Sequence, residues 1–369
     1  MQVILERELL LRAITESGSE AAKAYAAWRP TVDFSGPVDP ETTALLPQLH
    51  EALLALGLDD PLIGVFKGIC RRAWYENQTL LASAEHALGR LTREGIAGIL
   101  VGEIPLVLAY YESLYTRRIG QIDIVVAPRQ LRLAAQLLAA DGWTPEGPLT
   151  DEEIAYRHAK RFTGPGNRVF CLHWHFCAPA ANAAADEFFR SEARPCALNG
   201  TQARQLSPTA MLLHWLLAET PVFGTMPALW VADARAILGK AGNELDWARI
   251  AAFAVQERLA ARLEQKLQLL LRFGLQIPRP AFAMLHGGRA SVPDVIDKIV
   301  LSSPDRRWRR RAADKWGVLA DYLRSERPHG LAHGVGDLPH FVRHRWGLNG
   351  RREILPAIAR HLWRRKGLG

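Results

Sequence analysis

The sequence places one aspartate, Asp123, inside an otherwise apolar stretch. Residues 122–126 read Ile-Asp-Ile-Val-Val, and the alternation of a β-strand puts the Asp123 carboxylate on the same face as the Gln121 side chain. Because an unpaired buried carboxylate is costly, Asp123 needs either a partner or a chemical role. Two explanations stay open: an ion pair with Arg117 or Arg118, or a site where the carboxylate binds a metal ion or transfers a proton.

A second stretch carries four side chains of the kinds that bind zinc. Cys171, His173, His175 and Cys177 fall on one face of a predicted strand. The two ends of such a run lie about 20 Å apart at about 3.3 Å per residue, which is too far for one tetrahedral ion. At most one neighbouring pair could therefore share a metal ion, with further ligands from elsewhere. The ordinary interpretation is a sheet face whose polar groups turn toward a cleft.

Several common kinds of active site and of targeting segment are missing from the sequence. It has no Walker-type phosphate loop, no dinucleotide-binding fingerprint and no nucleophile-elbow serine. The first 17 residues mix acidic and basic residues with leucines, which is typical of an amphipathic helix and not of a signal sequence. No apolar run is long enough to span a membrane, and four cysteines in 369 residues indicate no disulfide framework. We therefore expect a cytoplasmic protein without a membrane partner.

The positive charge is concentrated near the C-terminal end. Residues 301–369 carry 16 Lys or Arg against 6 Asp or Glu, whereas the first 300 residues carry 30 against 32. Basic clusters at residues 306–311 and 364–366 alternate with tryptophans, a composition that occurs in nucleic-acid-binding surfaces. Two explanations stay open for residues 306–366: a surface that binds nucleic acid, or a basic helix face exposed to solvent.

The spacing of apolar residues predicts the elements that position these side chains. Residues 1–95 have helical spacing, with helices predicted at 2–26 (broken near Ser17), 40–56, 61–74 and 77–94. Strands are predicted at 95–101, around Asp123 and at 169–176, with helices at 105–115 and 128–140 and a polar loop at 145–166. Helices follow at 208–219, 227–238, 246–256, 258–273, 293–302, 306–327 and 352–365, with a loop at 328–351. We predict an α+β fold, mostly helical, with a small mixed β-sheet core between N- and C-terminal helical regions.

The order and spacing of several short motifs resemble those of the bacterial family of uncharacterised nucleotidyltransferases, in the polymerase-β-like superfamily. The motifs are at residues 74–77, 100–102, 117–126, 142–143, 171–174, 206–214, 229–233 and 245–247. The resemblance implies a helical region at 1–95, a nucleotidyltransferase-like α/β core at 96–205 and a C-terminal helical region with a basic tail at 206–369.

The resemblance also implies an activity and the positions that serve it. The family transfers a nucleoside monophosphate from an NTP to an acceptor, with Mg²⁺ held by carboxylates. The resemblance does not identify the acceptor for this chain, and a peptide and a small molecule are the two candidates. Gly102, Arg117 and Gly120 match nucleotide-binding positions, and Asp123 matches a metal ligand. The candidate catalytic residues are Asp123, Gln121, Cys171 and His173.

The sequence departs from the family at its carboxylates. Gln121 and Cys171 stand where the family has two of the three, so Asp123 alone remains of this catalytic set. Glu103 and Glu112 are close enough in sequence to be considered as replacements. Two hypotheses follow: a working nucleotidyltransferase with an altered metal shell, or an inactive relative that binds a nucleotide, a peptide or a protein.

Overall fold

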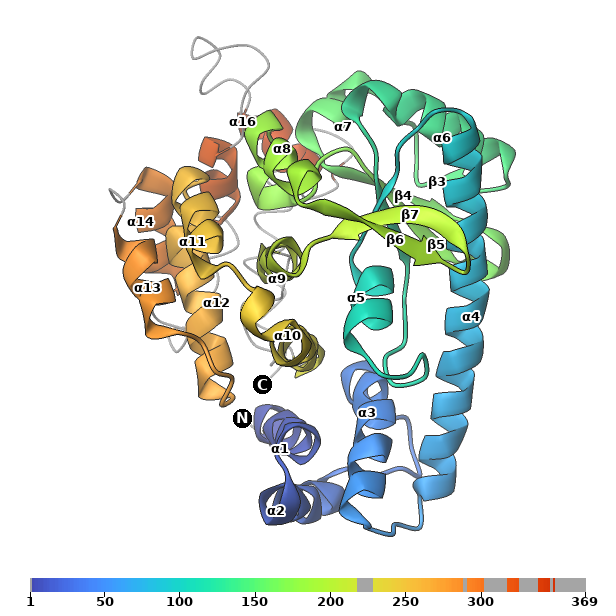
Figure 1. The fold of residues 1–369 in the computed structure, drawn as a ribbon, viewed down its shortest axis with the longest axis vertical. Helices are drawn as coiled ribbons and strands as arrows, with labels where there is room; N and C mark the ends of the chain where they lie inside the picture. The colour runs from blue at the N-terminus through green and yellow to red at the C-terminus, as the bar shows by residue number, and fades with distance from the viewer. Residues whose placement is uncertain are drawn as a thin grey trace.

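The computed structural model describes residues 2–217, 228–287, 291–301, 317–324, 338–345 and 348. These residues form a mostly helical α+β fold around a seven-stranded mixed sheet, as predicted (Figure 1). In chain order, helices precede the sheet, and a second group of helices follows it. The predicted fold class is therefore confirmed, while the division into three domains at residues 95 and 205 stays a prediction.

The helices that precede the sheet begin and end close to the predicted positions. They are α1 (Gln2–Thr15), α2 (Gly18–Trp28), α3 (Pro40–Leu56) and α4 (Ile63–Arg93). The start of α3 follows from local chemistry, because Asp39 accepts hydrogen bonds from the amides of Glu41 and Thr42 while Pro40 fits the first turn. The predicted break near Ser17 is confirmed as the end of α1 and the start of α2.

Helix α4 is continuous over 31 residues, so the predicted interruption between residues 74 and 77 is wrong. Asn77, which the sequence indicates as a helix start, is fully buried within this helix. Its Nδ2 donates to the carbonyl oxygens of Leu114 at 2.5 Å and Arg117 at 2.8 Å, and its Oδ1 accepts from the Ile119 amide at 2.7 Å. Figure 1 shows α4 running alongside the sheet toward α6, and its apolar side chains cluster with those of the central strands. One polar residue of α4 therefore fixes the loop that leads into the strand of Asp123.

The sheet has the strand order β3-β4-β5-β2-β1-β7-β6. Its strands are β1 (Ile99–Val101), β2 (Ile122–Val125), β3 (Thr144–Pro145), β4 (Ala159–Thr163), β5 (Val169–His173), β6 (Ala193–Leu198) and β7 (Thr201–Leu206). Strand β2 lies at the centre, antiparallel to β1 and parallel to β5. The three central strands were predicted. The prediction missed the outer strands because their exposed and charged side chains do not form an apolar run.

Four helices lie between the strands in the sequence. They are α5 (Glu103–Tyr110), α6 (Leu131–Ala140), α7 (Asp151–Tyr156) and α8 (Ala183–Ser191). The first two were predicted, although α5 ends five residues earlier than expected. Helix α7 and strand β4 occupy half of the stretch predicted as a polar loop at 145–166, so that prediction is wrong.

Both faces of the central strands are buried. Ile122, Ile124 and Val126 pack in a cluster with apolar residues of α4 and α6, whereas Val125 belongs to the cluster on the opposite face. This alternation confirms the predicted strand. It places Asp123 on the same face as Val125, where Asp123 is only 4% exposed.

The C-terminal helices are α9 (Pro208–Leu217), α10 (Ala228–Ala241), α11 (Trp247–Gln256), α12 (Ala260–Arg272), α13 (Arg279–His286), α14 (Val292–Leu301) and α16 (Leu338–Arg345), and residues 317–324 are also helical. The sequence did not predict α13, and α16 lies in a stretch predicted as loop. The basic clusters at 306–311 and 364–366 and the predicted helix at 352–365 lie outside the described residues. In the part of the chain that is described, no helix is both long enough and apolar enough to cross a membrane.

Asn77→Ala tests whether this side chain fixes the loop before β2. The substitution leaves two carbonyl groups and one amide without their buried partner. We expect the free energy of unfolding in urea to fall by roughly 2–4 kcal/mol. Tyr75→Ala on the same helix is the control, because Tyr75 is 68% exposed. Equal stability of the two variants would contradict the assigned role.

Candidate functional site

Asp123 lies between two neighbouring strands whose register places specific side chains beside it. In β1 its partner is Val101, and in β5 its partner is Cys171. His173 lies two residues further along β5, on the same face as Cys171. The three residues therefore converge because β2 and β5 run parallel in this register.

The Asp123 carboxylate is held by neutral or titratable groups and not by an arginine. Its Oδ1 accepts a hydrogen bond from Gln121 Nε2 at 2.8 Å and lies 2.9 Å from His173 Nε2. Arg117 and Arg118 pair with other carboxylates. The explanation by an ion pair with Arg117 or Arg118 is therefore wrong, and among the described residues His173 is the titratable side chain that pairs with the Asp123 carboxylate.

Gly102 allows the chain to pass directly over this carboxylate. Its φ of 70° and ψ of −137° form the turn between β1 and α5, in a region that favours glycine. A Cβ atom at this position would lie 2.7 Å from Asp123 Oδ2. The absence of a side chain at Gly102 is therefore a steric requirement of the Asp123 position.

Cys171 and His173 complete a compact group around Asp123. Among the described residues, these three form the one group in which potential metal-ligand atoms of Asp, Glu, His or Cys all lie within 4.8 Å of one another. Burial, together with the Asp123 charge, raises the pKa of the Cys171 thiol to about 12. The Nδ1 atom of His173 is buried and has no hydrogen-bond partner among the described residues.

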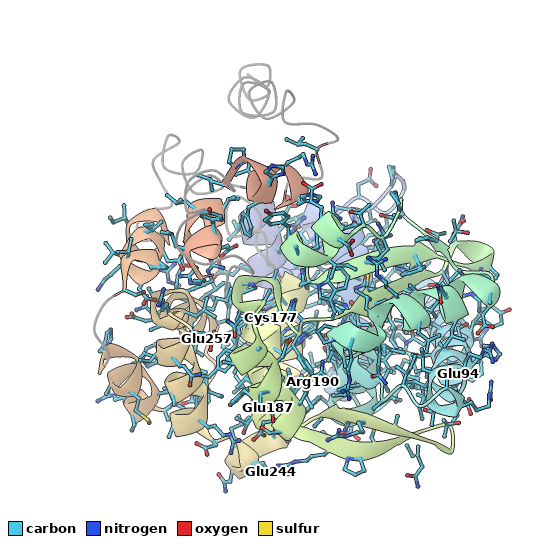
Figure 2. The ribbon with its side chains drawn as sticks, turned by 90° about the horizontal axis from the view of Figure 1, so that it is seen from above. Glu94, Cys177, Glu187, Arg190, Glu244 and Glu257 are labelled. Carbon is cyan, nitrogen blue, oxygen red and sulfur yellow. The ribbon has the colours of Figure 1, made fainter. Side chains whose placement is uncertain are left out.

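The remaining members of the His/Cys run point elsewhere. Strand β5 ends at His173, so the strand predicted to residue 176 is too long. His175 Nδ1 lies 2.7 Å from Asp186 Oδ2, and Cys177 is buried. Figure 2 labels Cys177 near Glu257, whose charge adds to burial in raising the thiol pKa. The predicted limit of one neighbouring pair agrees with this geometry, because Cys171 and His173 share a group with Asp123 while the other two do not.

Arg117, predicted to bind a nucleotide, is occupied by a buried ion-pair network. Its Nε lies 3.0 Å from Asp233 Oδ1 and its Nη2 lies 3.1 Å from Asp233 Oδ2, while Nη2 also lies 2.7 Å from Glu103 Oε1. The Tyr111 hydroxyl donates to the same Asp233 carboxylate at 2.6 Å. Burial alone would lower the pKa of Arg117, but the charges of Asp233 and Glu103 outweigh it and raise this pKa above its ordinary value. The guanidinium is thus charged and faces α10.

The two glutamates considered as replacement carboxylates are committed to other partners. Glu103 Oε2 accepts from the Gly120 amide at 2.6 Å, and its other oxygen binds Arg117. The Glu112 side chain is 85% exposed and pairs with Lys240 at 3.2 Å. Neither belongs to the group around Asp123. Gly120, predicted to bind a nucleotide, thus uses its amide to orient Glu103.

The donor atoms around Asp123 do not fit Mg²⁺, the ion that the family resemblance implies. Mg²⁺ takes near-octahedral oxygen ligands at 2.0–2.1 Å and is usually held by carboxylates. The group offers one carboxylate, one thiol and one imidazole. Gln121 adds an amide but no charge.

A comparison with models of known protein families confirms the family that the sequence resembles. A family model described as uncharacterised nucleotidyltransferase matches residues 41–273, a range that includes every strand of the sheet and the whole Asp123 group. A solved structure, of an antigenic nucleotidyltransferase-like protein from Paracoccidioides brasiliensis, is similar at 16% sequence identity, covering 58% of this chain and 94% of that chain with a TM-score of 0.33. No curated protein matches the sequence.

Gly102→Ala tests the close approach between the β1–α5 turn and Asp123. The added Cβ would collide with Asp123 Oδ2 in a backbone conformation that L-residues rarely adopt. We expect a loss of roughly 2–4 kcal/mol in the free energy of unfolding. Gly68→Ala in α4 is the matched control, because a Cβ there meets nothing within 4 Å, and it should stabilise by about 1 kcal/mol or less. A Gly102→Ala variant as stable as the wild type would contradict the assignment.

Asp233→Asn tests the buried ion pair. The amide leaves the Arg117 charge buried without its main counter-charge, so we expect a loss of about 3–5 kcal/mol in a denaturant titration. Glu112→Gln breaks an exposed ion pair and should change stability little. The ion pair would be unimportant if both substitutions had the same small effect.

Proposed function

The chain belongs to the uncharacterised nucleotidyltransferase family, and from that premise we propose that it transfers a nucleoside monophosphate from an NTP to an acceptor beside Asp123. The acceptor hydroxyl would attack the α-phosphorus, the bond to the leaving pyrophosphate would break, and the hydroxyl proton would leave to solvent or a base. A peptide and a small molecule are the two acceptor classes under this proposal.

The environment of Asp123 is the observation that supports the proposal. The residue is 4% exposed, and both arginines that could neutralise it structurally are paired elsewhere. Among the described residues its side chain contacts Gln121 and His173, and no arginine or lysine pairs with it. A carboxylate, a thiol and an imidazole that gather in one partly buried group are candidates for a functional site.

The turn at Gly102 is the proposed phosphate side of the site. Helix α5 begins immediately after Gly102, and the N-terminal end of a helix favours negatively charged groups. The turn lies against Asp123, so phosphates bound there would lie near the carboxylate. In this proposal Arg117 and Gly120 are positioning residues that hold the loop before β2, through Glu103 and Asp233.

A triphosphate at this turn would need a cation. Asp123 and the phosphates are all negative, and like charges at close range repel strongly in a partly buried site. Arg117 is committed to Asp233 and Glu103, and Arg118 pairs with Glu76. The proposal therefore includes a bound metal ion in an altered shell.

An inactive relative that binds a nucleotide, a peptide or a protein is the second candidate. It is favoured by a specific observation: within the described residues, no second carboxylate joins the group formed by Asp123, Cys171 and His173. Two of the three carboxylate positions implied by the resemblance hold Gln121 and Cys171.

Pyrophosphate release separates the two candidates. The purified protein is incubated with each NTP, an extract of peptides and metabolites, and Mg²⁺, Mn²⁺ or Zn²⁺ in turn. We expect release with at least one ion, and at least about a tenfold loss in Asp123→Asn, since one such interaction is worth more than 1.4 kcal/mol in the transition state. Glu112→Gln, on an exposed side chain, should keep the wild-type rate.

The double variant Gln121→Asp/Cys171→Asp tests the inactive candidate by a gain of activity. It restores carboxylates at the two departing positions, beside Asp123. If the wild type released no pyrophosphate with any ion while this variant did so with Mg²⁺, the inactive candidate would hold and the transfer proposal would fail. Thermal unfolding of each variant checks that it is folded.

A further inference from the structure

The group around Asp123 has the composition of a site for a softer metal ion than Mg²⁺. It combines one carboxylate, one thiol and one imidazole from two adjacent strands, with ligand atoms within 4.8 Å of one another. We infer that Asp123, Cys171 and His173 bind one thiophilic divalent transition-metal ion, of which Zn²⁺ is the representative. The inference rests on the proposed function only in naming the cation that the triphosphate would meet.

Ligand chemistry selects the class of ion. Thiolate and imidazole ligands favour Zn²⁺ and related transition ions, whereas Mg²⁺ prefers carboxylates, phosphates and water. Zinc sites that keep an open position have three protein ligands, drawn from Cys, His and Asp or Glu, and a fourth position for water or substrate. The Asp123, Cys171 and His173 side chains match this ligand number and these ligand types.

The distance between Asp123 and His173 requires only a small adjustment. Zinc bonds of about 2.0–2.3 Å place tetrahedral ligand atoms roughly 3.3–3.8 Å apart. Asp123 Oδ1 and His173 Nε2 now lie 2.9 Å apart, so the ion would replace the hydrogen between them and widen this pair by a few tenths of an ångström. Binding releases the Cys171 thiol proton to solvent, and His173 coordinates through Nε2 as a neutral imidazole that keeps one proton on Nδ1; no redox change is involved.

The strand register makes the site rigid. Asp123 and Cys171 are direct partners across β2 and β5, and both strands are central in the sheet. Side chains on such strands are held by packing on both faces, which preorganises ligands before the ion arrives.

Access to the ion is limited but present. Cys171 is partly exposed and the His173 side chain is 12% exposed, whereas Asp123 lies beneath the Gly102 turn. An ion here would therefore reach solvent on the side of Cys171 and His173. This is the side from which a substrate oxygen would complete the coordination.

Cobalt titration without nucleotide tests the metal site independently of any transfer activity. Metal-free protein is titrated with Co²⁺, whose bond to a thiolate gives a near-ultraviolet charge-transfer absorption, and then with Zn²⁺ or Mg²⁺ as competitors. We expect one Co²⁺ per chain with this absorption, displacement by Zn²⁺, and no displacement by Mg²⁺ at equal concentration. Cys171→Ser should abolish the absorption and weaken binding by at least about 100-fold, the upper end of what losing even an outer-shell partner costs.

Cys196→Ser is the matched control. Cys196 is also a partly exposed free cysteine, but it lies on β6, outside the group. This variant should keep the absorption and the affinity. Absorption that persists in Cys171→Ser, or a wild type that binds Co²⁺ without it, would overturn the inference. A normal metal titration together with no pyrophosphate release would instead overturn the proposed function alone.

Discussion

A buried ion pair between Arg117 and Asp233 determines how the centre of the sheet meets the C-terminal helices. The Asp233 side chain is fully buried, that of Arg117 is 4% exposed, and the two lie 116 residues apart in the sequence. The same guanidinium binds Glu103 at the start of α5, and Glu103 binds the Gly120 amide before β2. A buried charge without its partner is strongly destabilising, so α5, the loop before β2 and α10 must come together for the chain to fold.

This ion-pair network also determines which side chains near Asp123 can take part in a reaction. Arg117 and Glu103 neutralise and orient each other, so neither of them contacts the Asp123 carboxylate in β2. Asp123 instead contacts Gln121 and His173 and lies beside Cys171. The Arg117 charge is thus satisfied within this network, whereas Asp123 pairs with His173 and not with an arginine. We propose a nucleotide reaction at this face, and the donor atoms there fit a softer ion than the Mg²⁺ that the family resemblance implies.

The sequence revealed what depends on local chemistry. The alternation around Asp123 indicated a buried strand, and the apolar spacing indicated the helix at residues 40–56 that is α3. It could not reveal features whose cause lies far away in the chain. Asn77 appeared to begin a helix because its partners near residue 117 are about 40 residues distant. Arg117 appeared available to Asp123 or to a nucleotide because its partner Asp233 lies 116 residues further along the chain, in α10. The position of Cys171 and His173 beside Asp123 depends on the register of β2 with β5, which sequence spacing alone does not give. The sequence therefore showed two residue types that bind zinc but did not show that Asp123 is their neighbour.

The central claim is that Asp123, Cys171 and His173 form one metal site with a mixed ligand set. X-ray absorption spectroscopy of the zinc-loaded protein measures this most directly, because it counts the ligand types and their distances at the ion. The account predicts one sulfur ligand at about 2.3 Å together with nitrogen and oxygen ligands at about 2.0–2.2 Å, and loss of the sulfur in Cys171→Ser. A first shell without sulfur, or with more than one sulfur, would contradict it.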